Sequence, residues 1–158
     1  AQCDGFDPVP LAEMAERLAR DATPEHVDAA IAALKEAIRR DPLQLSLHRW
    51  LGQFHVLRYQ VRGDAADLKA AVAAMRRVLE LYPQSPDEHV NLAAMLTLAA
   101  SATGTAEWAQ EARAEYAKGL EIDAARPGLD EVRKWTAKRR GEVERAMQAV
   151  GQAATRPA

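Results

Sequence analysis

Apolar residues recur at intervals of three and four positions through most of the chain, which is the spacing of a helix with one buried face. In the stretch from Ser46 to Arg62 the apolar positions are Leu47, Trp50, Leu51, Phe54, Leu57 and Val61. Alanine is the commonest residue, and the strand-favouring residues valine, isoleucine and threonine are sparse. The pattern therefore predicts an all-α protein.

Helix start and stop signals divide this pattern into segments. Ser85 can cap a helix that has Pro86 at its first position, while Gly63 and Pro83 each interrupt a helical run. Asp64 can cap the helix that follows Gly63. We expect about seven helices, at about 10–20, 24–40, 46–62, 65–82, 86–102, 105–122 and 129–150.

The segments repeat with a period of 41 residues. Positions that coincide at this offset include Ala30, Ala71 and Ala112; Leu34, Met75 and Tyr116; Pro42, Pro83 and Ala124; His48 and His89; Gly63 and Gly104. A fixed period of this size indicates stacked helical hairpins, because one hairpin cannot bury its own apolar face. We expect one domain over residues 1–150, with repeats at about 9–42, 43–83 and 84–124, a capping helix at about 128–150 and a disordered tail at 151–158.

The repeat carries residues that resemble the tetratricopeptide repeat. Leu51-Gly52 lies midway along the first helix of a pair, the small Ala71 lies in the second, and Asp41-Pro42 ends the preceding repeat. The resemblance covers about residues 9–150 and implies a right-handed stack of antiparallel hairpins with a concave binding face. Small residues would let paired helices approach closely, and proline would end the second helix.

The period departs from that family, whose repeats have about 34 residues. The seven extra residues between Leu51 and Ala71 are close to two helical turns, so they can lengthen a hairpin while its buried face stays in phase. HEAT-type repeats, with periods of about 40–47 residues, are the alternative. The Leu-Gly and Asp-Pro placements favour the tetratricopeptide interpretation. The segments Leu81-Tyr82-Pro83-Gln84-Ser85-Pro86 and Leu120-Glu121-Ile122-Asp123 are also similar to the repeat tails that follow membrane spans in some bacterial O-antigen ligase-like proteins.

Composition and charge narrow the functional classes. The net charge of −2 argues against a general nucleic-acid binder, and no stretch of 18 apolar residues lacks charges, so we expect no membrane span. Cys3, as a single cysteine, excludes an internal disulfide and a cysteine-based zinc site. It is compatible with a cytoplasmic or an extracytoplasmic compartment. The start at Ala1 suggests a processed chain or an excised domain.

Catalytic and metal-binding patterns are not found in the sequence. The four histidines lack a metal-binding spacing, and the repeat equivalence of His48 and His89 favours a packing role. Six glutamates are assigned to solvated helix faces: Glu13, Glu16, Glu36, Glu107, Glu111 and Glu115. We therefore expect a protein that is not an enzyme and needs no cofactor and no metal.

A candidate peptide-binding groove follows from the tetratricopeptide resemblance. Its register implies that five side chains face the concave surface: Arg49, Gln53, Val56, Asn91 and Ala94. Arg49, Gln53 and Asn91 look like part of the family's clamp for a peptide carboxylate. The clamp's basic residues from a further repeat have no match, since Gly128 and Val132 fall there. Ordinary polar surface side chains are the alternative interpretation.

Two functions are compatible with these features. The first is a scaffold that binds a protein or an extended peptide on its concave face. The second is a structural or assembly element: the tail of a larger membrane-associated glycan-handling protein, or a module that self-associates through the edge of its terminal repeat.

Overall fold

The computed structural model describes residues 23–126 and 134–153, with side chains described as far as residue 150. These residues form six helices and no strand, which confirms the all-α prediction. The helices are α2 (Pro24–Arg40), α3 (Leu45–Arg62), α4 (Ala65–Leu81), α5 (Pro86–Thr103), α6 (Ala106–Ala125) and α7 (Ala137–Ala153). The short helix expected at about 10–20 lies outside the described residues.

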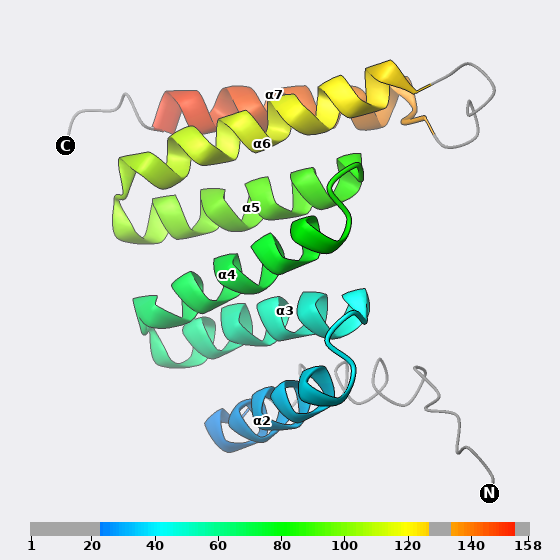
Figure 1. Ribbon diagram of the computed structural model, residues 1–158. Helices are drawn as coiled ribbons and strands as arrows, with labels where there is room; N and C mark the ends of the chain where they lie inside the picture. Colours follow the sequence, from blue (N-terminus) through cyan, green and yellow to red (C-terminus); the bar gives the residue numbers. More distant parts are fainter. Residues whose placement is uncertain (1–22, 127–133, 154–158) are drawn as a thin grey trace, which may run out of the picture.

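The helices lie one upon the next in chain order, and successive helices run in opposite directions (Figure 1). Each helix packs mainly on its neighbours in the chain, and α5 also touches α7. Consequently α2 and α7 lie at opposite ends of the stack (Figure 1). The two internal hairpins, α3–α4 and α5–α6, form its middle.

The helix boundaries follow the 41-residue offset. Helices α2, α4 and α6 begin at residues 24, 65 and 106, while α3 and α5 begin at 45 and 86. Gly63 and Gly104 end α3 and α5 with φ angles of 74° and 70°, which side chains with a Cβ rarely adopt. Two glycines 41 positions apart thus make the same turn between paired helices.

Equivalent side chains also have equivalent surroundings. Nε2 of His48 donates to the carbonyl of Pro42 at 2.9 Å, and Nε2 of His89 donates to the carbonyl of Pro83 at 3.0 Å. Ala30, Ala71 and Ala112 are all buried, as are Leu34, Met75 and Tyr116. The offset read from the sequence therefore relates residues that occupy the same place in the packing.

Two clusters of buried apolar side chains hold the stack together. One lies between α2 and α3, and the other extends from α4 to α7. Helix α3 approaches α4 closely at Gly52, where an added Cβ would lie 3.4 Å from both the carbonyl oxygen of Ala71 and Cγ of Met75. The Leu-Gly pair of the sequence therefore lies where the two helices of a hairpin come together.

Helix starts agree well with the sequence signals. Thr23 and Asp64 accept hydrogen bonds from the backbone N–H groups of His26 and Ala66, so both residues cap their helices. Ser85 caps α5 through the N–H of Glu88. The end of α6 differs, because the helix continues to Ala125 rather than stopping near residue 122. Prolines end the comparable helices, and α6 has alanine at that position.

The last helix begins later than predicted. The expected start near residue 129 lies outside the described residues, and Trp135, which falls inside the predicted range of 129–150, precedes α7. Asp123 accepts a hydrogen bond from the backbone N–H of Trp135 at 2.8 Å. Thr136 accepts one from the N–H of Arg139 at 3.2 Å, as a cap does. These bonds hold the chain in a non-helical entry, so that α7 starts at Ala137. It continues to Ala153, into the segment expected as a disordered tail.

Candidate functional site

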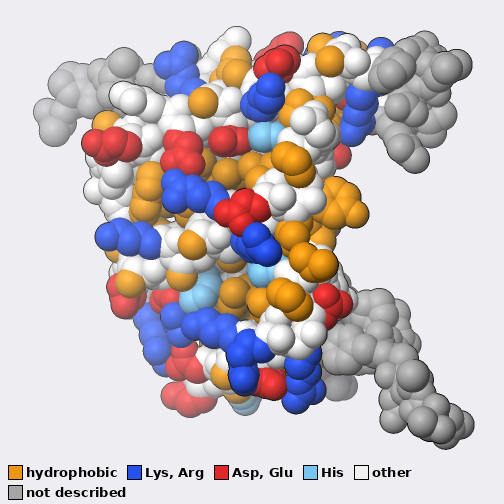
Figure 2. All heavy atoms as spheres, viewed as in Figure 1, with side chains coloured by type: hydrophobic (Ala, Val, Ile, Leu, Met, Phe, Trp, Pro, Cys, Tyr) orange, Lys and Arg blue, Asp and Glu red, His pale blue; other side chains and the backbone are white. Residues whose placement is uncertain are grey.

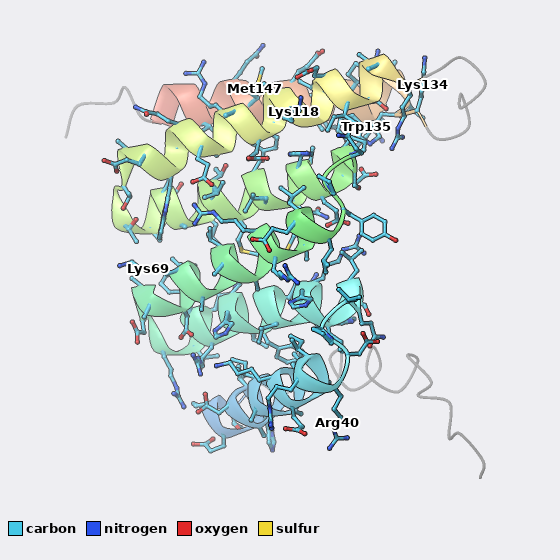
Figure 3. All side chains as sticks on the ribbon, in the orientation of Figure 1. Arg40, Lys69, Lys118, Lys134, Trp135 and Met147 are labelled. Carbon is cyan, nitrogen blue, oxygen red and sulfur yellow. The ribbon has the colours of Figure 1, made fainter. Side chains whose placement is uncertain are left out.

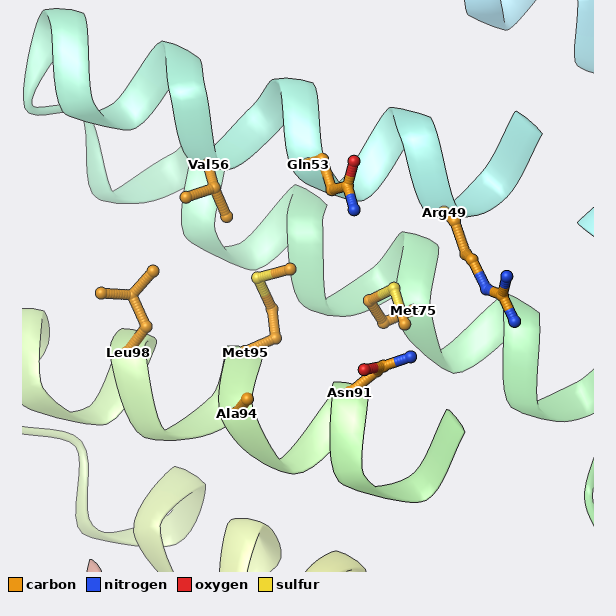
Figure 4. Close-up of a pocket in the computed structure, with 8 residues that line it drawn as sticks. All are labelled: Arg49, Gln53, Val56, Met75, Asn91, Ala94, Met95 and Leu98. Atoms are coloured by element: carbon orange, nitrogen blue, oxygen red, sulfur yellow. The ribbon is translucent and has the colours of Figure 1, made fainter. Parts of the chain in front are cut away.

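A groove lies between α3 and α5, with α4 beneath it (Figure 4). Its volume is about 340 Å³, and its lining is Arg49, Gln53, Val56, Met75, Asn91, Ala94, Met95 and Leu98. All five residues that the resemblance placed on a binding surface are in this set. The structure thus brings them together, while their role in binding stays a prediction.

The spacing of these residues explains why they converge. Arg49, Gln53 and Val56 follow one another at intervals of four and three on α3, which keeps them on one helix face. Asn91, Ala94 and the neighbouring Leu98 follow one another at intervals of three and four on α5, which also keeps them on one helix face. Because α3 and α5 are repeat-equivalent helices, the two faces lie side by side along the stack.

The groove has an apolar end and a polar end (Figure 4). Val56, Met95 and Leu98 lie together towards the C-terminal ends of α3 and α5. Arg49 and Asn91 lie towards the N-terminal ends of the same helices. Leu98 is 38% exposed, so part of its side chain is open to a ligand at the apolar end.

Glu88 completes the polar end, although it does not line the groove. Its side chain is only 1% exposed, and its Oε1 forms an ion pair with Nη2 of Arg49. Its Oε2 accepts a hydrogen bond from Nδ2 of Asn91 at 3.2 Å. One buried carboxylate therefore holds Arg49 and Asn91, two of the three polar side chains that the resemblance suggested as a clamp. Nε of Arg49 is buried and has no hydrogen-bond partner.

Sequence reasoning missed four contributors: Glu88, Met75, Met95 and Leu98. Glu88 follows Ser85 by three positions, which is the pattern of a helix cap, so its position suggested a local role. Leu98 and Met95 could have been found, because they lie four positions beyond Ala94 and Asn91 on the same helix face.

A second polar cluster joins α2, α3 and α4. Asp67 is 3% exposed and accepts hydrogen bonds from Nδ1 of His55 at 3.0 Å and Nε of Arg58 at 2.8 Å. Arg58 also donates to Asp28 of α2 at 3.0 Å. The cluster links three consecutive helices through Arg58, so we interpret it as a structural feature that holds the helices together.

Burial and hydrogen bonding shift the protonation of this cluster. Burial lowers the pKa of His55 below its ordinary value, against the hydrogen bond to Asp67 that would raise it. Burial alone would raise the pKa of Asp67, but hydrogen bonds from Arg58 and His55 outweigh it and hold that pKa below its ordinary value. The pair is therefore a neutral imidazole donating to a carboxylate.

Charged side chains elsewhere on the molecule are largely paired. Figure 2 shows acidic and basic side chains interspersed over one face, with basic ones most frequent around the end that carries α2 and α3. Lys118, labelled on α6 in Figure 3, pairs with Glu121 at 3.1 Å. Glu115, expected on a solvated face, instead lies half-buried with Oε2 at 2.6 Å from Nδ1 of His89.

Metal-binding groups and membrane-spanning helices are both absent from the residues that the structure describes. Within residues 23–126 and 134–150, no three His, Cys, Asp or Glu side chains are grouped as a metal ion would require. None of the described helices is long and apolar enough to cross a membrane.

Comparisons with known proteins give no relative from which a role could be transferred. No family model matches the chain, and no curated protein matches it either.

Proposed function

We propose that this chain is a non-enzymatic module that binds a protein or an extended peptide in the groove between α3 and α5. In this proposal the hairpins form a right-handed tetratricopeptide-like stack, and the groove lies on its concave face. The observation that carries the proposal is the convergence of side chains from two repeat-equivalent helices on one groove with an apolar and a polar end.

The groove suits a peptide better than a small polar metabolite. Val56, Met95 and Leu98 offer apolar surface for a side chain, and methionine adapts its shape to varied partners. Gln53 and Asn91 carry amides that can hydrogen-bond to a peptide backbone. The polar cluster of Asp67 provides no rival site, because its groups are buried and already bonded to one another.

The test is a selection of peptides from a displayed library on the whole chain, followed by affinity measurements with purified variants. Leu98→Lys places a charge at the apolar end of the groove, and we expect it to weaken the selected peptides by at least about tenfold. Leu43→Lys is the matched control, since Leu43 is 68% exposed and does not line the groove.

The two variants together decide the proposal. Unchanged affinity for the control and lost affinity for Leu98→Lys would support binding in the groove. Equal affinity of the selected peptides for wild type and Leu98→Lys would place binding elsewhere and reject it. Thermal unfolding of each variant checks that any loss comes from the surface and not from the fold.

A further inference from the structure

We propose that the groove selects a ligand that is uncharged at its polar end: an internal peptide segment with an aliphatic side chain, and not a free carboxylate. The inference rests on the proposed function, and it names the chemistry of the ligand. Its basis is that Glu88, a residue of the chain itself, already supplies the carboxylate for Arg49 and Asn91.

The first step concerns charge. Arg49 is the only cation among the groove's lining residues, and Glu88 pairs with it from a position that is 1% exposed. The other lining side chains carry no charge. An incoming carboxylate would have to share Arg49 with the buried carboxylate of Glu88, and two like charges held close together repel one another.

The second step concerns hydrogen-bond direction. A carboxylate only accepts, so the contact with Glu88 fixes Asn91 with Nδ2 towards Glu88. The carbonyl Oδ1 of Asn91 and the second N–H of its Nδ2 then remain for a ligand, and together they match the N–H and C=O of peptide bonds. An acceptor suits the N–H of a peptide bond and disfavours a carboxylate. Gln53, on the opposite helix, adds an amide that both donates and accepts.

The third step concerns shape. Val56 on α3 faces Leu98 on α5, with Met95 between the two helices (Figure 4). Met75 of α4 lines the same groove from beneath. Met95 beside the partly exposed Leu98, with the buried Met75 beneath them, forms an adaptable apolar surface, which matches a leucine or methionine side chain. The ligand is therefore an aliphatic residue flanked by peptide bonds.

Two small probes with the same side chain test this directly. N-acetyl-leucine methylamide is neutral and carries two peptide bonds, whereas N-acetyl-leucine is an anion at pH 7. Each is titrated into the whole chain labelled with ¹³C at the methionine methyl groups. Met75 and Met95 report on the groove, and Met147 of α7 serves as the internal reference.

The proposal expects the neutral probe to shift the Met75 and Met95 signals and to bind at least about fivefold more tightly than the anion. Equal or tighter binding of the anion would overturn it while leaving the proposed function standing. If neither probe shifts Met75 or Met95, the inference and the proposed function fail together.

A charge-neutral substitution tests the role of Glu88. Glu88→Gln keeps the side-chain shape and releases Arg49 from its carboxylate, so the anion should gain at least about fivefold in affinity over wild type. Glu111→Gln is the control, because it makes the same change in net charge at a residue paired with Arg76 outside the groove. No gain in Glu88→Gln, with folding shown by an intact melting transition, would overturn the inference. If Glu88→Gln does not fold, the two probes on wild type still decide it.

Discussion

Oδ2 of Asp123 lies 2.7 Å from Nη2 of Arg140, and this contact joins α6 to α7 through an aspartate with no exposed surface. The other oxygen of the same carboxylate accepts the backbone N–H of Trp135 at 2.8 Å. Burial alone would raise the pKa of Asp123, but the hydrogen bonds from Arg140 and Trp135 hold it below its ordinary value. One side chain thus fixes both the entry to α7 and its first turn.

Asp123→Ala should therefore loosen α7 before the rest of the stack. We expect the free energy of unfolding to fall by about 2 kcal/mol, because a buried hydrogen-bonded carboxylate is lost. Hydrogen exchange should show the amides of α7 losing protection first. Glu121→Ala, which removes an exposed carboxylate from the same helix, should cost less than about 0.5 kcal/mol. Equal losses in the two variants would contradict this role for Asp123.

Replacing two helical glycines by alanine should change the stability of the protein in opposite directions. A Cβ at Gly119 would lie 3.0 Å from the carbonyl oxygen of Pro86 and 3.3 Å from Val90, so Gly119→Ala should destabilise the protein by about 1–2 kcal/mol. A Cβ at Gly141 would meet only the flexible end of Arg145, at 3.5 Å. Gly141→Ala should stabilise by up to about 1 kcal/mol through helix propensity. Urea denaturation of both variants measures the difference, and a stabilising Gly119→Ala would refute the close contact.

Stability should decline as the pH falls below about 6.5 because of His55. Its pKa is lowered in the folded protein by burial, so the unfolded chain takes up a proton first and is favoured on acidification. The contribution is complete above the unfolded pKa and is lost as the pH falls towards the depressed folded value. Lys35 and Arg58 act in the same direction, and Asp67 opposes them.

The measurement is the free energy of unfolding at pH 7.5 and pH 5.5. We expect wild type to lose up to about 1 kcal/mol more than His55→Gln over this interval. Parallel pH profiles for wild type and His55→Gln would show that His55 does not carry the dependence. Further loss below about pH 4 should come from Asp67 and Asp123, whose pKa values are held down in the fold.

The two repeat-equivalent histidines, His48 and His89, should contribute different amounts to the free energy of unfolding. Both donate from Nε2 to a proline carbonyl, but His89 also lies 2.6 Å from Glu115 through Nδ1. His89→Gln should therefore cost about 1 kcal/mol more than His48→Gln in the free energy of unfolding. A cycle that adds Glu115→Gln to His89→Gln isolates the extra contact. Equal costs would mean that the contact with Glu115 contributes nothing.

The helical framework could be predicted because its signals are local. Thr23, Asp64 and Ser85 cap helices as their positions suggested, and Gly63 and Gly104 make the same turn 41 residues apart. The start of α7 could not be predicted, because it depends on Asp123, which is remote in sequence from Trp135. The apolar pattern alone predicts a helix that runs through Trp135.

The residues of the groove could also be predicted only in part. Its five predicted residues converge because three share one face of α3 and two share one face of α5, and these two helices are repeat-equivalent. The pairing of Glu88 with Arg49 could not be predicted, because a glutamate at the third helical position also fits a capping pattern. Only the packing of α3 beside α5 shows that its carboxylate pairs with Arg49.

The chain-order packing of the helices has a mechanical consequence. Because each helix is held chiefly by the ones before and after it, folding closes only short loops, and we expect it to be complete within milliseconds. For the same reason, tension applied at the two ends should detach single helices from either end of the stack, while the middle hairpins stay folded.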